Sequence, residues 1–263
     1  LCPRRNTRNT HACPKRKCTM KQVFKAIREW LQLVLVALVL LQVFFIGRVA
    51  WMAVSDPAST AFERSQAWQI FSQKGHLKWR QDWRKTDQIS VNLKRAVLAS
   101  EDSGFTQHKG VWWESIEKAW RKNASAQAKL EAQAAKASGK KSMPKIVGGS
   151  TITQQLAKNL LLTGERTMLR KGQEWVITMA LETFLTKKQI LTLYLNHVEW
   201  GLGVFGAEAA AQHYFQKPAA KLSEWEAARL SVMLPRPRFF EKLPQSVYLS
   251  DRAQTIMARM NDV

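Results

Sequence analysis

The sequence GGSTITQQLAKNL, at residues 148–160, is the stretch that decides the fold. Two glycines precede Ser150 and Thr151, either of which is placed to cap a helix that ends by Gly164. Behind the cap, aliphatic residues recur at the spacing of one helical face: Ile152, Leu156 and Leu160. The stretch predicts an amphipathic helix that packs one face against a core.

The other side of this helix is polar. Thr151, Gln155 and Lys158 share a face, and Gln154 lies beside them. Amides, a hydroxyl and a lysine at a glycine-flanked helix N-terminus suit sugar hydroxyls and phosphate oxygens. An ordinary solvated face has the same composition, so the stripe alone leaves both interpretations open.

The next predicted helix, at residues 167–185, carries charges on its apolar face. Arg170 and Glu174 continue a line of expected core residues, namely Ile177, Leu181 and Phe184. A charged pair at core positions is either a buried salt bridge or the lining of a pocket between this helix and the rest of the domain.

Two further helices are predicted by capping boxes. Thr186 with Gln189 begins one helix, and Ser223 with Glu226 begins another that Pro235 stops.

Between these helices, Gly201, Gly203 and Gly206 spell G-x-G-x-x-G. The preceding segment has helical spacing and the chain lacks alternating strand and helix units, so dinucleotide binding is not indicated. Close helix packing or a tight turn explains the glycines better.

Upstream, Leu93, Ala96 and Val97 follow helical spacing until Gly104 interrupts it, which places Glu101 near a helix C-terminus. The helix dipole disfavours a carboxylate there, and partial burial would raise its pKa further, as a base acting near neutral pH requires. A solvated acid in the last turn is the alternative.

Residues 31–46 read LQLVLVALVLLQVFFI, with only two glutamines among apolar residues. From Trp30 to Gly47 a helix would be about 27 Å long, enough for a bilayer core. A buried core helix and a cleaved signal peptide are the alternatives. Nine Lys and Arg residues precede the first acid, Glu29, so the positive-inside rule predicts a basic cytoplasmic tail at 1–29, a transmembrane helix at 30–52 and export of the remainder.

Composition limits the class of partner. The 263 residues have ordinary glycine and proline contents, which excludes collagen-like, wholly disordered and disulfide-scaffold proteins. Lys and Arg number 41 against 20 Asp and Glu, a net charge of +21. This surplus predicts an anionic partner. The cysteines (Cys2, Cys13 and Cys18) all precede the apolar segment, so no disulfide is expected in the exported part.

Two other segments stand out by composition. Residues 53–85 interleave aromatics such as Trp68 and Trp83 with lysines and arginines, which favours a membrane-proximal surface over nucleic acid. Residues 122–145 are rich in Ala, Lys, Ser and Gln and cannot bury a face, so they predict a mobile insertion. The S-x-x-K match at 138–141 lacks its companion motifs and is ascribed to chance.

Taken together, the sequence resembles the monofunctional peptidoglycan glycosyltransferases of bacterial inner membranes. Five blocks in order carry the resemblance: EDSGFTQHKG (101–110), GGSTITQQLAKNL (148–160), RKGQE (170–174), KQILTLYLNHVEWGLGVFG (188–206), and residues 207–237. The resemblance implies a mostly α, lysozyme-like glycosyltransferase domain at 86–263, tethered by one transmembrane helix, that polymerises lipid II into glycan strands in the periplasm.

It also implies roles for single residues. Glu101 would be the catalytic base, and Glu174 would orient the donor sugar or the neighbouring cations. Lys158, Arg170 and Lys171 would neutralise the diphosphate leaving group. Ser150, Gln154 and Gln155 would bind sugar or phosphate.

Cofactors and partners follow from the same resemblance. No organic cofactor is expected, and Asp102 is a candidate ligand for a divalent cation, Mg²⁺ or Mn²⁺, with the metal requirement left open. The expected partners are lipid II, the growing glycan strand, the membrane and proteins of cell-wall synthesis or division. A scaffolding protein with the same fold and a lysozyme-type hydrolase are the alternative functions.

Overall fold

The computed structural model describes residues 20–114, 117, 120–121, 124–125, 149–162 and 167–263. Its α-helices are α1 (Met20–Trp51), α2 (Ala61–Lys74), α3 (Val91–Glu101), α5 (Ile152–Leu161), α6 (Met168–Phe184), α7 (Lys187–His197), α8 (Ala207–Phe215), α9 (Glu224–Met233), α10 (Pro237–Phe240) and α11 (Val247–Met257). The predicted mostly α class is confirmed. Apart from residues 124–125, the predicted insertion at 122–145 lies outside the described residues, as do the cysteines.

The apolar segment forms the second part of α1, which is long and apolar enough to cross a membrane. Only 6% of its apolar window is buried, which contradicts the alternative of a buried core helix. The described part of the helix already includes Met20–Glu29, before the predicted span, because lysine and arginine are good helix formers even where they cannot enter a bilayer core. The chain divides into two compact units, residues 1–44 and residues 45–263.

Capping boxes begin four of the helices in the second unit. The predicted boxes Thr186–Gln189 and Ser223–Glu226 are present, and Thr151 rather than Ser150 caps α5. A fourth box, Thr60–Glu63, begins α2. In each box the hydroxyl accepts a backbone N–H three residues on, and the acidic or amide side chain accepts the N–H of the cap residue.

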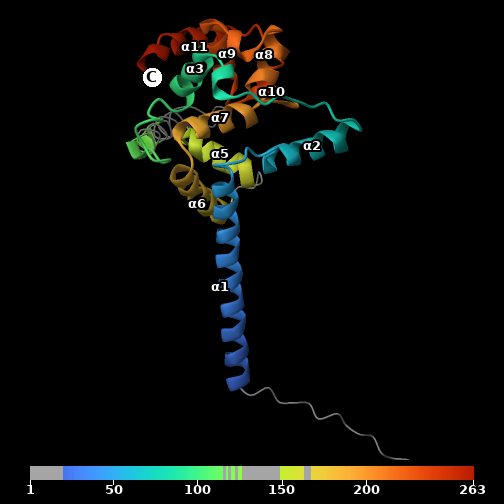
Figure 1. Cartoon of the computed structure of the whole chain (residues 1–263), viewed down its shortest axis with the longest axis vertical. Coiled ribbons are helices and arrows are strands. Elements are labelled where there is room, and N and C mark those ends of the chain that lie inside the picture. The colour runs from blue at the N-terminus through green and yellow to red at the C-terminus, as the bar shows by residue number, and fades with distance from the viewer. Residues whose placement is uncertain (1–19, 115–116, 118–119, 122–123, 126–148, 163–166) are drawn as a thin grey trace, which may run out of the picture. The chain divides into compact units, whose positions relative to one another are not determined.

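Two groups of helices build the core of the second unit (Figure 1). In one group α9 packs against α3 and α11, and in the other α5 packs against α6 and α7. The predicted apolar faces are buried at Leu93, Val97, Ile152, Leu156, Leu160, Ile177 and Leu181. Phe184 was expected in this set but is 44% exposed, because α6 ends there.

A small three-stranded sheet, which sequence analysis did not predict, lies between the helices. Its order is β1 (Arg80–Gln81), β3 (Val204–Phe205), β2 (Glu199–Gly201), with β1 parallel and β2 antiparallel to β3. Gly203 has φ +74°, and a Cβ there would lie 2.0 Å from the carbonyl oxygen of Lys78. The tight-turn interpretation of the glycine motif is therefore correct.

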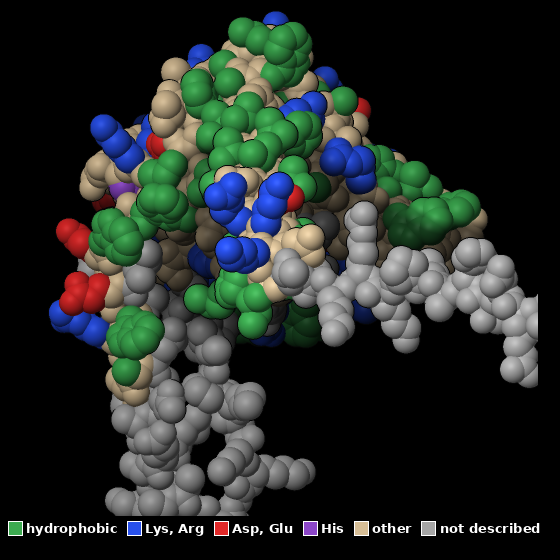
Figure 2. All heavy atoms as spheres, turned by 90° about the horizontal axis from the view of Figure 1, so that it is seen from below, with side chains coloured by type: hydrophobic (Ala, Val, Ile, Leu, Met, Phe, Trp, Pro, Cys, Tyr) green, Lys and Arg blue, Asp and Glu red, His purple; other side chains and the backbone are tan. Residues whose placement is uncertain are grey.

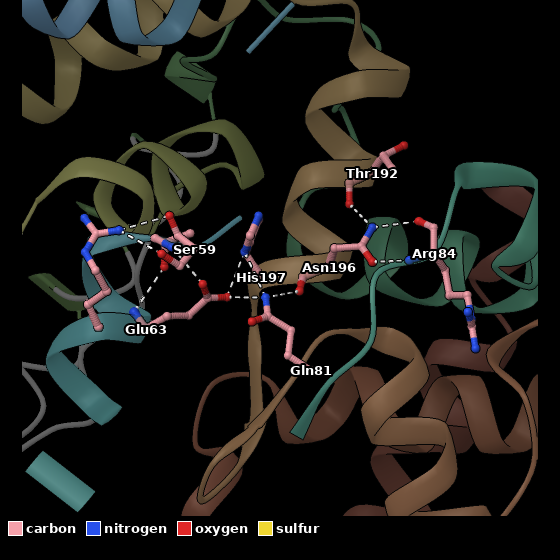
Figure 3. A network of polar contacts seen from close by, with 9 residues as sticks. Ser59, Glu63, Gln81, Arg84, Thr192, Asn196 and His197 are labelled. Atoms are coloured by element: carbon pink, nitrogen blue, oxygen red, sulfur yellow. Dashed lines mark hydrogen bonds and ion pairs between the residues drawn. The ribbon is translucent and has the colours of Figure 1, made fainter. Parts of the chain in front are cut away.

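A buried polar network joins α2, β1 and α7 (Figure 3). The Glu63 carboxylate accepts from Gln81 Nε2 at 2.8 Å, and His197 Nδ1 lies 2.7 Å from the same oxygen. Asn196 pairs with the backbone of Arg84 through both amide atoms, at 2.8 and 2.9 Å. The segment before α3 is thus fastened to the end of α7.

The remaining elements are short 3₁₀ turns, η1 (Thr86–Gln88), η2 (Ala219–Lys221) and η3 (Met260–Asp262). On the surface, Trp68 is 71% and Phe71 is 51% exposed on α2, among basic neighbours. In the view of Figure 2, hydrophobic and basic side chains are interspersed and acidic ones are few. This composition is compatible with the predicted membrane-proximal surface.

Candidate active site

Glu101 is the last residue of α3, as predicted. Its side chain is partly buried, and this burial raises the pKa of the carboxyl group. The hydrogen bond from Gln155 lowers the pKa, and the nearby charge of Asp102 raises it, with a net upward shift. Both parts of the expectation for Glu101, its place at the helix end and its raised pKa, are confirmed. A carboxylate with a raised pKa is a stronger proton acceptor than an ordinary glutamate.

Gln155, on α5, is hydrogen-bonded to Glu101. Its Nε2 donates to Glu101 Oε2 at 2.8 Å, and its Oε1 accepts from the hydroxyl of Tyr194 at 3.1 Å. Since an ionised carboxylate can only accept, the amide must turn its N–H₂ toward Glu101, and the phenol must donate to the amide oxygen. Burial, followed by the charges of Glu101 and Asp102, raises the pKa of Tyr194, so the phenol keeps its proton.

Asp102 has a different environment from its neighbour. It is buried, and its two oxygens accept from His108 Nε2 at 2.8 Å and from the backbone N–H of Ile152 at 3.0 Å. Thr151 also donates to the Gly110 carbonyl at 2.6 Å. These bonds close the loop after α3 onto the N-terminus of α5, so that Glu101 and Gln155 meet.

This geometry does not fit the suggested role of Asp102 as a metal ligand. Both oxygens are bound by protein donors, and 1% of the side chain is exposed, which leaves no room for a cation with its other oxygen ligands. Within the described residues, no group of three or more His, Cys, Asp or Glu side chains is arranged to hold a metal ion.

On α6, Glu174 forms ion pairs with two basic side chains. Its Oε2 accepts from Arg170 Nη1 at 3.1 Å and its Oε1 from Lys171 Nζ at 2.5 Å. Glu174 is 4% exposed, whereas the Lys171 side chain is 51% exposed. The pair therefore does form the salt bridge named as one alternative. Because two cations share one carboxylate, the cluster keeps a net positive charge.

One donor of this cluster is unused in the described part of the chain. Arg170 Nε is buried there without a hydrogen-bond partner. Buried donors are ordinarily satisfied, so this N–H is an exception among the described residues.

The other candidates on and before α5 separate into different roles. Gln154 is buried and its Oε1 accepts the N–H of Thr151 at 3.1 Å, so it serves the capping box. Lys158 and Ser150 are exposed. Of the predicted polar stripe, Gln155 is the member with a hydrogen bond to Glu101.

The helix α5 connects the two clusters. Gln155 on α5 binds Glu101, and α5 packs against α6, which carries Arg170, Lys171 and Glu174. Thr153 of α5 donates to Glu182 of α6 at 2.5 Å, and Lys187 donates to the same oxygen at 2.8 Å.

Sequence reasoning missed Tyr194, His108 and Glu182. His108 and Tyr194 lie within quoted blocks, but only the three-dimensional contacts distinguish them from their neighbours. Glu182 is on the same side of α6 as Thr178, which shows that this side is also buried.

A helical domain that presents a partly buried carboxylate of raised pKa, together with a positively charged cluster, has the features of a group-transfer enzyme acting on an anionic substrate. Residues 69–261 match the Transglycosylase family model. The chain is 44% identical to a biosynthetic peptidoglycan transglycosylase of Janthinobacterium sp. (strain Marseille), over 91% of this chain and 97% of the relative. A protein of the same name from Bordetella pertussis is 42% identical, over 95% and 98% of the two chains. The chain belongs to the transglycosylase family.

Proposed function

We propose that the protein is a peptidoglycan glycosyltransferase that polymerises lipid II into β-1,4-linked glycan strands. The observation that carries the proposal is Glu101, a carboxylate of raised pKa held by Gln155, in a domain that also presents the Arg170–Lys171–Glu174 cluster. The names of the relatives support the same reaction class.

In the proposed reaction Glu101 accepts the proton of the 4-hydroxyl of the acceptor N-acetylglucosamine. The freed oxygen attacks the anomeric carbon of the donor N-acetylmuramic acid, the bond from that carbon to the diphosphate oxygen breaks, and the configuration inverts. The electron pair leaves with undecaprenyl diphosphate, and Glu101 holds the proton until it passes to water.

The leaving diphosphate gains negative charge in this step. Arg170, Lys171 and Lys158 are the cations assigned to it, and the exposed side chains of Lys171 and Lys158 can reach phosphate oxygens. Ser150 is assigned to sugar or phosphate oxygens because it is exposed beside the start of α5. We assign no step to a metal, because Asp102 is engaged in holding the loop and α5 together.

The test is a polymerisation assay with purified protein and labelled lipid II. Long glycan strands and released undecaprenyl diphosphate are the expected products. Binding of lipid II without any product would favour the scaffolding alternative, and cleavage of preformed glycan would favour a hydrolase.

Glu174→Gln is expected to weaken donor binding together with rate, because Arg170 and Lys171 lose the charge that fixes their side chains. A loss of about tenfold or more in kcat/KM, with a raised KM, is expected since two charge-assisted hydrogen bonds are weakened. Glu117→Gln, which removes an exposed ion pair with Arg121, is the matched control and should leave both parameters unchanged. An unchanged KM in Glu174→Gln would remove the assigned orienting role.

Tyr194→Phe is expected to slow polymerisation at neutral pH by about three- to tenfold, the equivalent of one hydrogen bond. Without the phenol, the Gln155 amide can rotate and donates less well to Glu101, so the pKa of Glu101 rises further. The acid limb of the rate profile should therefore move to higher pH. The measurement is the rate of polymerisation against pH for both proteins; a uniform loss with an unmoved limb would argue for a packing role of Tyr194.

The apolar helix α1 supports membrane anchoring of the chain. We propose further that this helix lies in the bacterial inner membrane with the N-terminus in the cytoplasm and the catalytic domain in the periplasm, which is where lipid II and the glycan strand meet. The cations before Glu29 support this orientation. Proteins of cell-wall synthesis or division are proposed partners, and no nucleic acid is expected.

A reporter enzyme that is active only outside the cytoplasm, fused after Val263, is expected to be active. A matching fusion of a cytoplasm-only reporter should be inactive. The reverse pattern would contradict the orientation, and with it the access of the domain to periplasmic substrate.

A further inference from the structure

A polar groove lies directly after α1, apart from the candidate active site. It has a volume of about 440 Å³ and is lined by residues 52–56, by Trp83, Lys85 and Thr86, and by Lys188, Gln189 and Thr192 of α7. A second hollow of about 280 Å³ shares Asp56 and Trp83 with it, so these two residues stand at the junction of both. The combined space is of the size that small ligands occupy.

The groove is on the far side of α7 from the active site. Lys188 and Thr192 are four residues apart and so lie on one face of the helix. Tyr194, which serves Glu101 through Gln155, is two residues beyond Thr192 and is turned by about 200° from it. The groove therefore contributes nothing to the chemistry at Glu101.

The chain itself keeps the groove close to the end of the membrane-spanning segment. The apolar run ends at Gly47, and Met52, the first lining residue, follows five residues later along α1 and its last turn. At about 1.5 Å per helical residue this is roughly 8 Å. Trp51, 63% exposed, is of the residue type that lies at the headgroup level of membranes.

The groove carries opposite charges that do not pair with each other. Lys85 and Lys188 form no ion pair with any described residue, and neither does Asp56, although all three line the same space. After burial, the charge of Lys188 lowers the pKa of Lys94, and that of Asp87 raises it, so Lys188 lies near a second lysine and an acid. The side chains of Asp56, Lys85 and Lys188 are all exposed, so they are open to a ligand that itself carries a phosphate and an ammonium group.

We propose that this groove binds the headgroup of a zwitterionic phospholipid with a primary ammonium, its phosphate at Lys85 and Lys188 and its ammonium at Asp56 and the face of Trp83. Lysine binds phosphate as a point charge, and a carboxylate beside an aromatic face is a recurrent arrangement for ammonium groups. The bound lipid fixes the domain beside the membrane. The proposal needs the membrane anchor but not the reaction proposed for Glu101.

The test is lipid retention by the full-length protein in detergent, measured by native mass spectrometry with phosphatidylethanolamine, phosphatidylcholine or phosphatidylglycerol added in turn. One phosphatidylethanolamine should be retained at about tenfold lower lipid concentration than the other two. Its primary ammonium can donate hydrogen bonds to Asp56, whereas the quaternary ammonium of phosphatidylcholine has no N–H and phosphatidylglycerol has no cation. Equal retention of all three would overturn the proposal. Because no turnover is measured, its failure is distinct from failure of the proposed enzyme function.

Variants test separately the residues proposed to bind the phosphate and those proposed to bind the ammonium group. The double variant Lys85→Gln with Lys188→Gln should weaken retention of phosphatidylethanolamine about tenfold, and Asp56→Asn should remove its preference over phosphatidylglycerol. The control is Lys221→Gln with Arg252→Gln, which removes the same charge from exposed positions outside the groove and should change nothing. Equal losses in the control, or an unchanged preference in Asp56→Asn, would overturn the assignment.

A soluble competitor separates the headgroup from a free anion. Millimolar phosphoethanolamine should displace retained phosphatidylethanolamine, whereas inorganic phosphate at the same concentration should not. Equal displacement by both would show that the groove recognises phosphate alone, against the proposal.

Discussion

Glu101→Gln is expected to reduce lipid II polymerisation by about 10²- to 10⁴-fold while substrate binding survives. Glutamine keeps nearly the same shape and can still accept the hydrogen bond from Gln155, but it cannot take up a proton. The measurement is the polymerisation rate with lipid II, together with lipid II affinity from a binding titration. A variant that polymerises at near the parental rate would remove Glu101 as the base.

The stability of the same variant is an independent readout. The pKa of Glu101 is raised in the folded protein, so the carboxyl group stabilises the fold below the unfolded-state pKa, and this contribution is lost as pH rises through the folded-state pKa. At neutral pH the buried carboxylate is therefore a cost to stability. Glu101→Gln is expected to melt at the same temperature as the parent or slightly higher, which separates loss of chemistry from loss of fold.

The pH dependence of the parent enzyme follows from the same shift. Only ionised Glu101 can accept the acceptor's proton, so the rate should fall as pH drops through its raised pKa. The fall is expected at higher pH than for an ordinary glutamate.

Sequence reasoning located the elements that depend on local patterns. The capping boxes at Thr186 and Ser223, the buried face of α5 and the place of Glu101 at the end of α3 each depend on residues a few positions apart. Local spacing determines these features, because a cap and an i, i+4 face are formed within one helix.

Features that depend on distant residues were not predicted. The sheet pairs Arg80 with Val204, and the Tyr194 hydroxyl of α7 donates a hydrogen bond to Gln155 of α5. Gln154 and Gln155 are adjacent and chemically identical in sequence, yet one caps α5 and the other holds Glu101. Which amide faces the active site depends on how α5 packs against α3 and α7, and periodicity alone does not specify that.

The surroundings of Asp102 argue against a metal-ligand role for a related reason. Beside Glu101 in sequence, it had been a candidate metal ligand, but the helix ends between the two residues and turns Asp102 toward His108 and the N-terminus of α5. Two adjacent carboxylates thus have different environments: Glu101 is held by Gln155 and is our proposed proton acceptor, and Asp102 fixes the loop beside it.

Glu63→Ala is expected to destabilise the domain by about 3–5 kcal/mol, which is typical when one partner of a buried charged network is removed. Glu63 is fully buried and combines two functions (Figure 3). Its Oε2 caps α2 by accepting the N–H of Thr60 at 2.7 Å. Its Oε1 accepts a hydrogen bond from Gln81 Nε2 at 2.8 Å and lies 2.7 Å from His197 Nδ1. Without the carboxylate, the Thr60 N–H, Gln81 Nε2 and His197 Nδ1 all lose an acceptor.

The matched control is Glu226→Ala. Glu226 caps α9 in the same way, accepting the N–H of Ser223 at 2.9 Å, but its other oxygen pairs with Lys217, whose side chain is 39% exposed. Loss of a cap alone costs about 0.5–2 kcal/mol. Thermal melting of the detergent-solubilised protein should therefore show a shift of about 6–20 °C for Glu63→Ala, and a several-fold smaller shift for Glu226→Ala. Equal shifts would mean that Glu63 acts only as a helix cap, and that the bond from α2 to His197 does not hold α2, β1 and α7 together.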